Sequence, residues 1–134
     1  MISVEQVINR AGEEGVMPLL TLDEFFAGND DEGCIAPNQW GYGRPPLADL
    51  AGRLRAIEQR VDVAWVRVQL HPETLDMEEL TAEAVAICTM ADKATCAAWT
   101  EGFEASGVIP DLVDDYQDVP EVPHGAAVWS VVWD

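Results

Sequence analysis

PLADLAGRLRAIEQR (residues 46–60) runs directly into VDVAWVRVQL (residues 61–70), and the hydrophobic period changes where the two meet. In the first stretch apolar side chains recur at spacings of three and four, which is typical of an amphipathic helix, and Pro46 suits its first position. In the second stretch most residues are apolar and the pattern alternates, which predicts a strand. The helix would present Leu47, Leu50, Leu54 and Ile57, and the strand Val63 and Trp65 on one face and Ala64, Val66, Val68 and Leu70 on the other.

Capping and turn residues divide the rest of the chain. Ser3 with Gln6, and Thr21 with Glu24, form two capping boxes, and each box predicts a short helix. Residues 28–46 are rich in glycine and proline and predict a loop. In chain order, the other predicted elements are a helix over 3–11, a helix between Thr21 and Gly28, an acidic connection over 72–81, a strand over 82–90, a helix over 93–106, a loop over 110–124 and a strand over 125–134.

The order α-α-α-β-β-α-β predicts a single α+β domain over residues 1–134. Its small, mainly antiparallel sheet would have about three strands, packed with about four helices. The strands over 61–70 and 125–134 are apolar on both faces, so the sheet needs cover on both sides. Only the helix over 46–60 is long and strongly amphipathic, and a second copy of the chain is therefore the simpler source of that cover. A homodimer is expected on this ground.

The charge balance is strongly negative, with 25 acidic residues against 7 basic ones and a net charge of −18. Such a surface repels nucleic acid and anionic membranes and attracts cationic partners. A hydrophobic content of 49% with five tryptophans argues against a disordered acidic tail. No apolar run approaches the roughly 18–20 residues of a membrane span, and the N-terminal residues lack the pattern of a signal peptide. These features predict a cytoplasmic protein with reduced cysteines.

Two segments, 73–83 and 111–121, place apolar or aromatic residues among clustered acids. Acids steer a cationic partner and orient it, while a few anchors supply affinity, and Tyr116 is the expected anchor. The alternative is that acidic loops only keep the protein dispersed. The predicted partner-binding residues are Glu73, Asp76, Glu78, Glu79, Asp111, Asp114, Asp115, Tyr116 and Asp118.

Other chemistry finds little support in the sequence. Asn29, Asp30, Asp31 and Glu32 could hold a cation, but the EF-hand spacing fails and turns that bond local backbone donors are favoured. Cys34 follows acids that disfavour a thiolate, the histidines show no zinc spacing, and no catalytic motif is present. No catalytic residue, metal or cofactor is therefore predicted.

Two further stretches carry expectations about packing. Arg53 and Arg60 are seven residues apart on the helix over 46–60. We expect them to pair with the acidic loops rather than to form an anion site. The loop over 41–46 shows no phosphate-binding pattern, and we expect it to let Trp40 and Tyr42 pack.

The segment LTLDEFFAGNDDEG (residues 20–33) resembles the N-terminal signature of an uncharacterised family of small acidic bacterial proteins. That family is similar to immunity proteins encoded beside polymorphic toxins. The resemblance extends over residues 18–108. It implies an intact small domain and supplies no catalytic residues.

These observations favour a non-enzymatic binding protein that occludes a basic protein partner, as immunity proteins do. One alternative is a small hydrolase or ligand-binding domain that uses carboxylates in a pocket beside the sheet. A closed pocket containing a perturbed Asp or Glu would favour that alternative. A second alternative is a structural homodimer.

Overall fold

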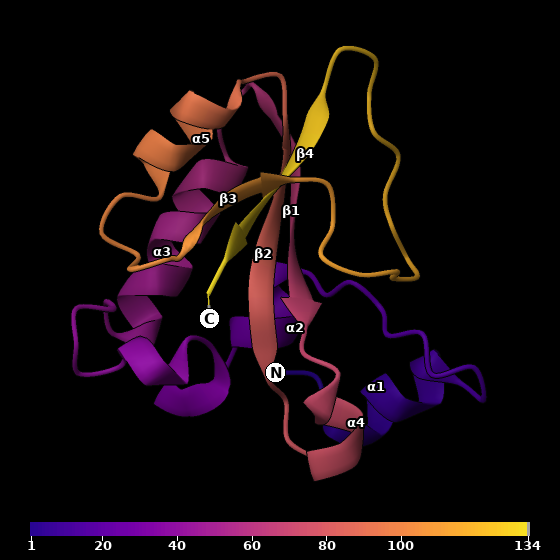
Figure 1. The fold of residues 1–134 in the computed structure, drawn as a ribbon. Helices are drawn as coiled ribbons and strands as arrows, with labels where there is room; N and C mark the ends of the chain where they lie inside the picture. Colours follow the sequence, from indigo (N-terminus) through magenta and orange to yellow (C-terminus); the bar gives the residue numbers. More distant parts are fainter. Residues whose placement is uncertain (134) are drawn as a thin grey trace.

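An antiparallel sheet with the strand order β1-β2-β4-β3 forms the centre of the protein (Figure 1). The computed structural model describes residues 1–133, and over this range the predicted α+β class is confirmed. The strands are β1 (Val63–Leu70), β2 (Ala82–Thr89), β3 (Gly107–Pro110) and β4 (Ala127–Val132). The helices are α1 (Val4–Ala11), α2 (Leu22–Phe26), α3 (Leu47–Glu58), α4 (Glu73–Met77) and α5 (Lys93–Trp99), with 3-10 turns at Glu32–Cys34 and Pro37–Gln39.

The local signals at the helix starts hold in the structure. Both capping boxes are formed, by Ser3 with Gln6 at α1 and by Thr21 with Glu24 at α2. The predicted apolar stripe of α3 is buried. Pro46 occupies the N-cap position, one residue before the helix, and not the first helical position. These features depend on neighbours within one or two turns, so the sequence alone determines them.

The β1 strand differs from its prediction at the start. Val63 is turned back by a hydrogen bond from its N–H to the carbonyl of Arg60 (3.1 Å), so the strand begins there and Val61 is fully exposed. A bulge between Val63 and Trp65 then shifts the alternation, and the two side chains lie in different core clusters instead of on one face. A bulge inserts one residue and so reverses the faces beyond it.

Residues 93–110 depart furthest from the predicted elements. The helix ends at Trp99 rather than at residue 106. Arg53 donates to the carbonyls of Trp99 (3.1 Å) and Glu101 (2.8 Å), and Gly102 turns the chain with a φ angle of 88°. The following turn brings Phe103 into the core. The chain then forms β3, which was predicted as helix end and loop. β3 has four residues, and glycine and proline at its ends conceal the strand pattern.

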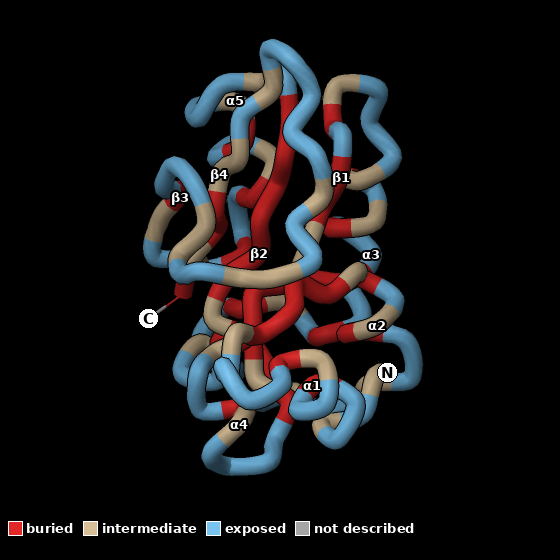
Figure 2. Tube along the Cα trace, turned by 90° about the vertical axis from the view of Figure 1, so that its right-hand side faces the viewer, coloured by how far each residue is buried: buried red, intermediate tan, exposed pale blue. Residues whose placement is uncertain are grey.

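One face of the sheet is covered by helices. α3 and α5 lie side by side against it, on the left in Figure 1, and α2 packs against β1. The buried side chains of this face form the main core, in which β2 is buried along almost its whole length (Figure 2).

The other face of the sheet is covered by residues 111–126, here called the strap. This segment leaves β3, runs along the right-hand side of the sheet in Figure 1 and returns to β4, and Figure 2 shows it crossing in front of β2. Below it, Leu19, Trp65, Ala86 and Cys88 form a second core cluster, against which Leu112, Tyr116 and Ala126 of the strap pack. A homodimer was expected because the second face of the sheet needs cover. The chain itself supplies that cover, so this argument for a dimer was wrong. The predicted strand over 125–134 is shorter, and residue 134 lies outside the described residues.

Candidate functional site

The first part of the strap is fastened by two buried side chains of the sheet. The Nε2 of Gln69 donates to the Oγ of Ser130 (2.7 Å), and this hydroxyl donates to the carbonyl of Asp111 (2.6 Å). The Oε1 of Gln69 accepts the N–H of Val113 (2.9 Å). Gln69 and Ser130 are completely buried, so these bonds are shielded from water. The backbone of the acidic segment is thus held at a defined position on the sheet.

The middle of the strap is held by Tyr116, which was predicted as an exposed anchor. Its ring is half-buried and packs against both core clusters, and its hydroxyl donates to the carbonyl of Leu70 (2.7 Å). Burial raises the pKa of Tyr116, and the negative charges of Glu83 and Asp114 raise it further. The hydroxyl therefore stays protonated as a donor. Tyr116 positions the strap, and this inward role was not expected.

The rest of the strap is fastened at two more points. The side-chain amide of Gln117 donates to the carbonyls of Arg10 and Val16, the latter at 2.6 Å. The indole N–H of Trp65 donates to the carbonyl of Glu121 (3.0 Å). Although it is a long connection rich in acids, the strap is therefore a fixed part of the fold.

Substitution of Tyr116 by phenylalanine should remove one hydrogen bond and leave the ring packing in place. We expect the free energy of unfolding to fall by about 1 kcal/mol in urea denaturation. Tyr42→Phe is the matched control, because the side chain of Tyr42 is 81% exposed, and it should leave stability unchanged. Equal stability of the two variants would contradict the positioning role of Tyr116.

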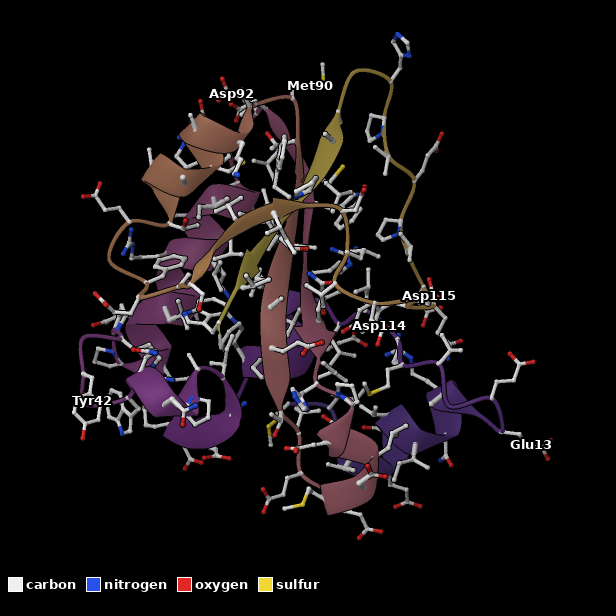
Figure 3. The ribbon with its side chains drawn as sticks, in the orientation of Figure 1. Glu13, Tyr42, Met90, Asp92, Asp114 and Asp115 are labelled. Carbon is white, nitrogen blue, oxygen red and sulfur yellow. The ribbon has the colours of Figure 1, made fainter. Side chains whose placement is uncertain are left out.

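The predicted acids of the strap fall into two groups. Asp111 and Asp118 adopt positive φ angles of 65° and 61°, which aspartate tolerates better than most residues, and they make turns. Asp118 also forms an ion pair with Arg10 (2.7 Å). Asp114 and Asp115 are exposed neighbours on the outer side of the strap (Figure 3). In the described part of the chain neither forms an ion pair, and the Oδ1 of Asp114 accepts the N–H of Asp115 (2.8 Å).

The predicted acids of the other segment lie on and beside α4. Glu73, Asp76, Glu78 and Glu79 are all exposed. In Figures 1 and 2 this helix lies below the strap, on the side of the molecule away from α3. We call the eight carboxylates on these two segments the acidic surface: Glu73, Asp76, Glu78, Glu79, Asp111, Asp114, Asp115 and Asp118.

Glu83, at the start of β2, interacts electrostatically with His71, which precedes α4, and with Asp114 of the strap. It was not among the predicted site residues. Burial raises the pKa of its carboxyl group, the nearby His71 lowers it, and the charge of Asp114 raises it. Its position in an apolar strand was the signal in the sequence, since a charged residue there is rarely without a role.

The arginines of α3 do not pair with the acidic loops as expected. The Nη2 of Arg53 donates to the carbonyls of Trp99 (3.1 Å) and Glu101 (2.8 Å), so Arg53 caps the end of α5. Arg60 stacks over the ring of Trp99 at 4.3 Å and pairs with Asp62 (3.2 Å). The two guanidinium groups bond within the fold, as expected, but their partners are carbonyls, an aromatic ring and Asp62 rather than the acidic loops.

The segment over 29–34 forms turns that bond the local backbone, as the favoured interpretation predicted. The Oδ1 of Asn29 accepts the N–H of Asp31, and the Oδ1 of Asp31 accepts the N–H of Gly33, both at 3.0 Å. The thiol of Cys34 is buried, and burial raises its pKa to about 12. Among residues 1–133, no group of three or more His, Cys, Asp or Glu side chains is arranged to hold a metal ion.

The loop after this segment is centred on Arg44, whose side chain is buried. Its guanidinium stacks on Trp40 at 4.6 Å and is bonded to Glu32. Tyr42 does not pack, contrary to expectation. The loop turns outward through Gly41 and Gly43, whose φ angles are 85° and 116°. A side chain at Gly43 would also meet Glu104.

These observations define a small α+β protein whose sheet is covered by helices on one face and by an acidic strap on the other. The chain matches the model of the uncharacterized protein YfbO family over residues 2–131, and it belongs to that family. The expectation of an uncharacterised family is thereby confirmed. No curated protein and no solved structure matches the chain. Within residues 1–133, no helix is long and apolar enough to cross a membrane.

Proposed function

We propose that this protein binds a basic protein partner through the acidic surface and occludes a cationic site on it, in the manner of an immunity protein. The observation that carries the proposal is the fixed strap. Buried side chains hold its backbone on the sheet, while Asp114 and Asp115 project from it into solvent. A surface held in its binding geometry loses less conformational entropy on association, and this favours affinity.

The charge distribution supports fast association. A net charge of −18 creates a long-range attraction for a cationic protein. Arg10 is the basic residue bonded to the strap, and its charge is already paired with Glu24 and Asp118. The exposed carboxylates of Asp114 and Asp115 therefore face a partner without a competing internal cation.

Binding to the product of the neighbouring gene tests this proposal, because immunity proteins are encoded beside their targets. The association rate should fall by at least about tenfold between low and high salt, as expected for electrostatic steering. The double substitution Asp114→Asn with Asp115→Asn should slow association a further threefold or more. Stopped-flow tryptophan fluorescence measures these rates.

The matched control is the double substitution Glu13→Gln with Glu14→Gln. It removes the same number of charges from an exposed turn outside the acidic surface, where Glu13 lies at the edge of the molecule in Figure 3. This variant should associate almost as fast as the unaltered protein. Association that is independent of salt, or equally slow in the two double variants, would overturn the proposal.

A further inference from the structure

A cleft of about 380 Å³ opens at the end of the sheet where β1 stops and β2 starts. Its walls come from four parts of the fold: the turn at Pro37–Gln39, His71 with Glu73, the first residues of β2, and Trp133 after β4. This volume lies within the range of small-molecule sites. The acidic surface shares only Glu73 with it.

The imidazole of His71 lines the cleft and lies close to both of its carboxylates. Its Nδ1 accepts the backbone N–H of Glu73 (3.0 Å), which requires a free lone pair on that nitrogen. Its Nε2 lies 3.9 Å from the Oε2 of Glu83. Two carboxylates therefore share a single imidazole, and even a positively charged ring would leave one negative charge of the cleft uncompensated.

Among the residues that line the cleft, the two carboxylates have only His71 as an ion-pair neighbour. The Oε2 of Glu73 lies 4.0 Å from the Nδ1 of His71, and this separation, like that of Glu83, exceeds hydrogen-bond distance. Within the described chain, neither carboxylate accepts a hydrogen bond, and no lysine or arginine lines the cleft. The side chain of Glu83 is only 27% exposed, and burial raises the pKa of its carboxyl group. A half-buried carboxylate with so little compensating charge is stabilised by a cation that enters the cleft.

The aromatic wall of the cleft is Trp133. Its indole N–H donates to the carbonyl of Phe103 (3.0 Å) and is therefore not free to bind a ligand. Tryptophan is the ring that attracts cations most strongly, and the small exposed part of Trp133 (7%) lines the cleft. The exposed Asn38 also lines the cleft and adds an amide.

We propose that this cleft binds a guanidinium or primary ammonium group, held by Glu83 and Glu73 and packed against Trp133. This proposal goes beyond the binding of a basic protein, because it stands even if the acidic surface has no partner. The cation could be a free small amine or the side chain of an arginine or lysine on the basic partner. Both sources share this chemistry, and the experiment below separates them.

The test is a titration of the intact protein with butylguanidinium and butylammonium, followed by NMR. Saturable shifts are expected for the His71 ring and the Trp133 indole N–H, while the neutral probe butanol should produce none. Glu83→Gln keeps the shape of the side chain and should weaken binding of both cations at least tenfold. Glu14→Gln removes the same charge outside both the cleft and the acidic surface and should change affinity less than twofold.

Non-saturable shifts, an equal response to butanol, or unchanged affinity in Glu83→Gln would overturn the proposal. The same spectra show whether each variant is folded. To separate the sources, the cations are titrated into the complex with the neighbouring-gene product. Competition indicates that a partner side chain fills the cleft, whereas undiminished binding indicates a free amine. If that product does not bind at all, the titration of the free protein still decides the proposal.

Discussion

Substitution of Arg44 by methionine should lower the free energy of unfolding by about 3–5 kcal/mol, as measured in urea denaturation. Arg44 is 3% exposed. Its Nη1 donates to the carbonyls of Glu32 (2.8 Å) and Ile35 (2.9 Å), and its Nη2 is bonded to the carboxylate of Glu32. Methionine fills similar space but leaves two carbonyls and a carboxylate without their donor. The loss should be large because breaking one side of a buried ion pair leaves the other charge uncompensated.

The effect should reach α3, because Glu32 serves two partners. Its Oε1 also accepts the N–H of Leu47 (2.9 Å) at the start of this helix. Arg55→Met is the matched control, because Arg55 of α3 pairs with the exposed Asp23 of α2 (3.1 Å), and such surface pairs contribute about 0–1 kcal/mol. A loss in Arg44→Met no larger than in this control would show that the loop over 28–46 does not depend on Arg44.

The parts of the fold that the sequence predicts are those set by nearby residues. The capping boxes at Ser3 and Thr21 and the buried stripe of α3 depend on contacts within a turn or two of helix. The start of β1 instead depends on the hydrogen bond from Val63 to Arg60, and the end of α5 at Trp99 on the bonds from the distant Arg53 to the carbonyls of Trp99 and Glu101. Periodicity does not distinguish these outcomes, because the side-chain pattern continues past both Val63 and Trp99.

The cover of the second sheet face shows a different limit. The sequence indicated that both faces of the sheet need cover, but a loop rich in proline and aspartate gives no hydrophobic period that would assign it to a sheet. The residues that could have indicated the strap are polar. Gln69 and Ser130 each interrupt an apolar strand at a buried position. A buried polar side chain must find a partner, and here the partners are backbone groups of the strap.

The candidate site also has features that the sequence predicts and features that it does not. Charge is visible in a sequence, and the eight predicted carboxylates are all exposed in the structure. Which aromatic residue faces outward depends on tertiary contacts, and Tyr116 and Tyr42 were both assigned the opposite environment to the one they have. The grouping of Glu83 with His71 and Trp133 joins three separate segments and could not be inferred from spacing.

Substitution of Gln69 by leucine should lower the free energy of unfolding by about 2–3 kcal/mol, because the N–H of Val113 loses its acceptor and the buried hydroxyl of Ser130 loses a donor. Leucine has a similar volume, so the change is mainly one of hydrogen bonding. Amide hydrogen exchange should become faster in residues 112–116 while the amides of β2 keep their protection. Gln59→Leu, at the exposed end of α3, is the control and should change stability by less than about 0.5 kcal/mol.

The Gln69→Leu variant also separates charge from geometry in the proposed function, because it retains every carboxylate of the acidic surface. Its association with the basic partner should stay as fast and as sensitive to salt as in the unaltered protein, since steering depends on charge. Dissociation should be several times faster, because a loosened strap must be ordered again on binding. The double substitution at Asp114 and Asp115 should have the opposite signature, with slower association. If Gln69→Leu dissociated at the unaltered rate despite faster exchange in the strap, the fixed position of the strap would not contribute to binding.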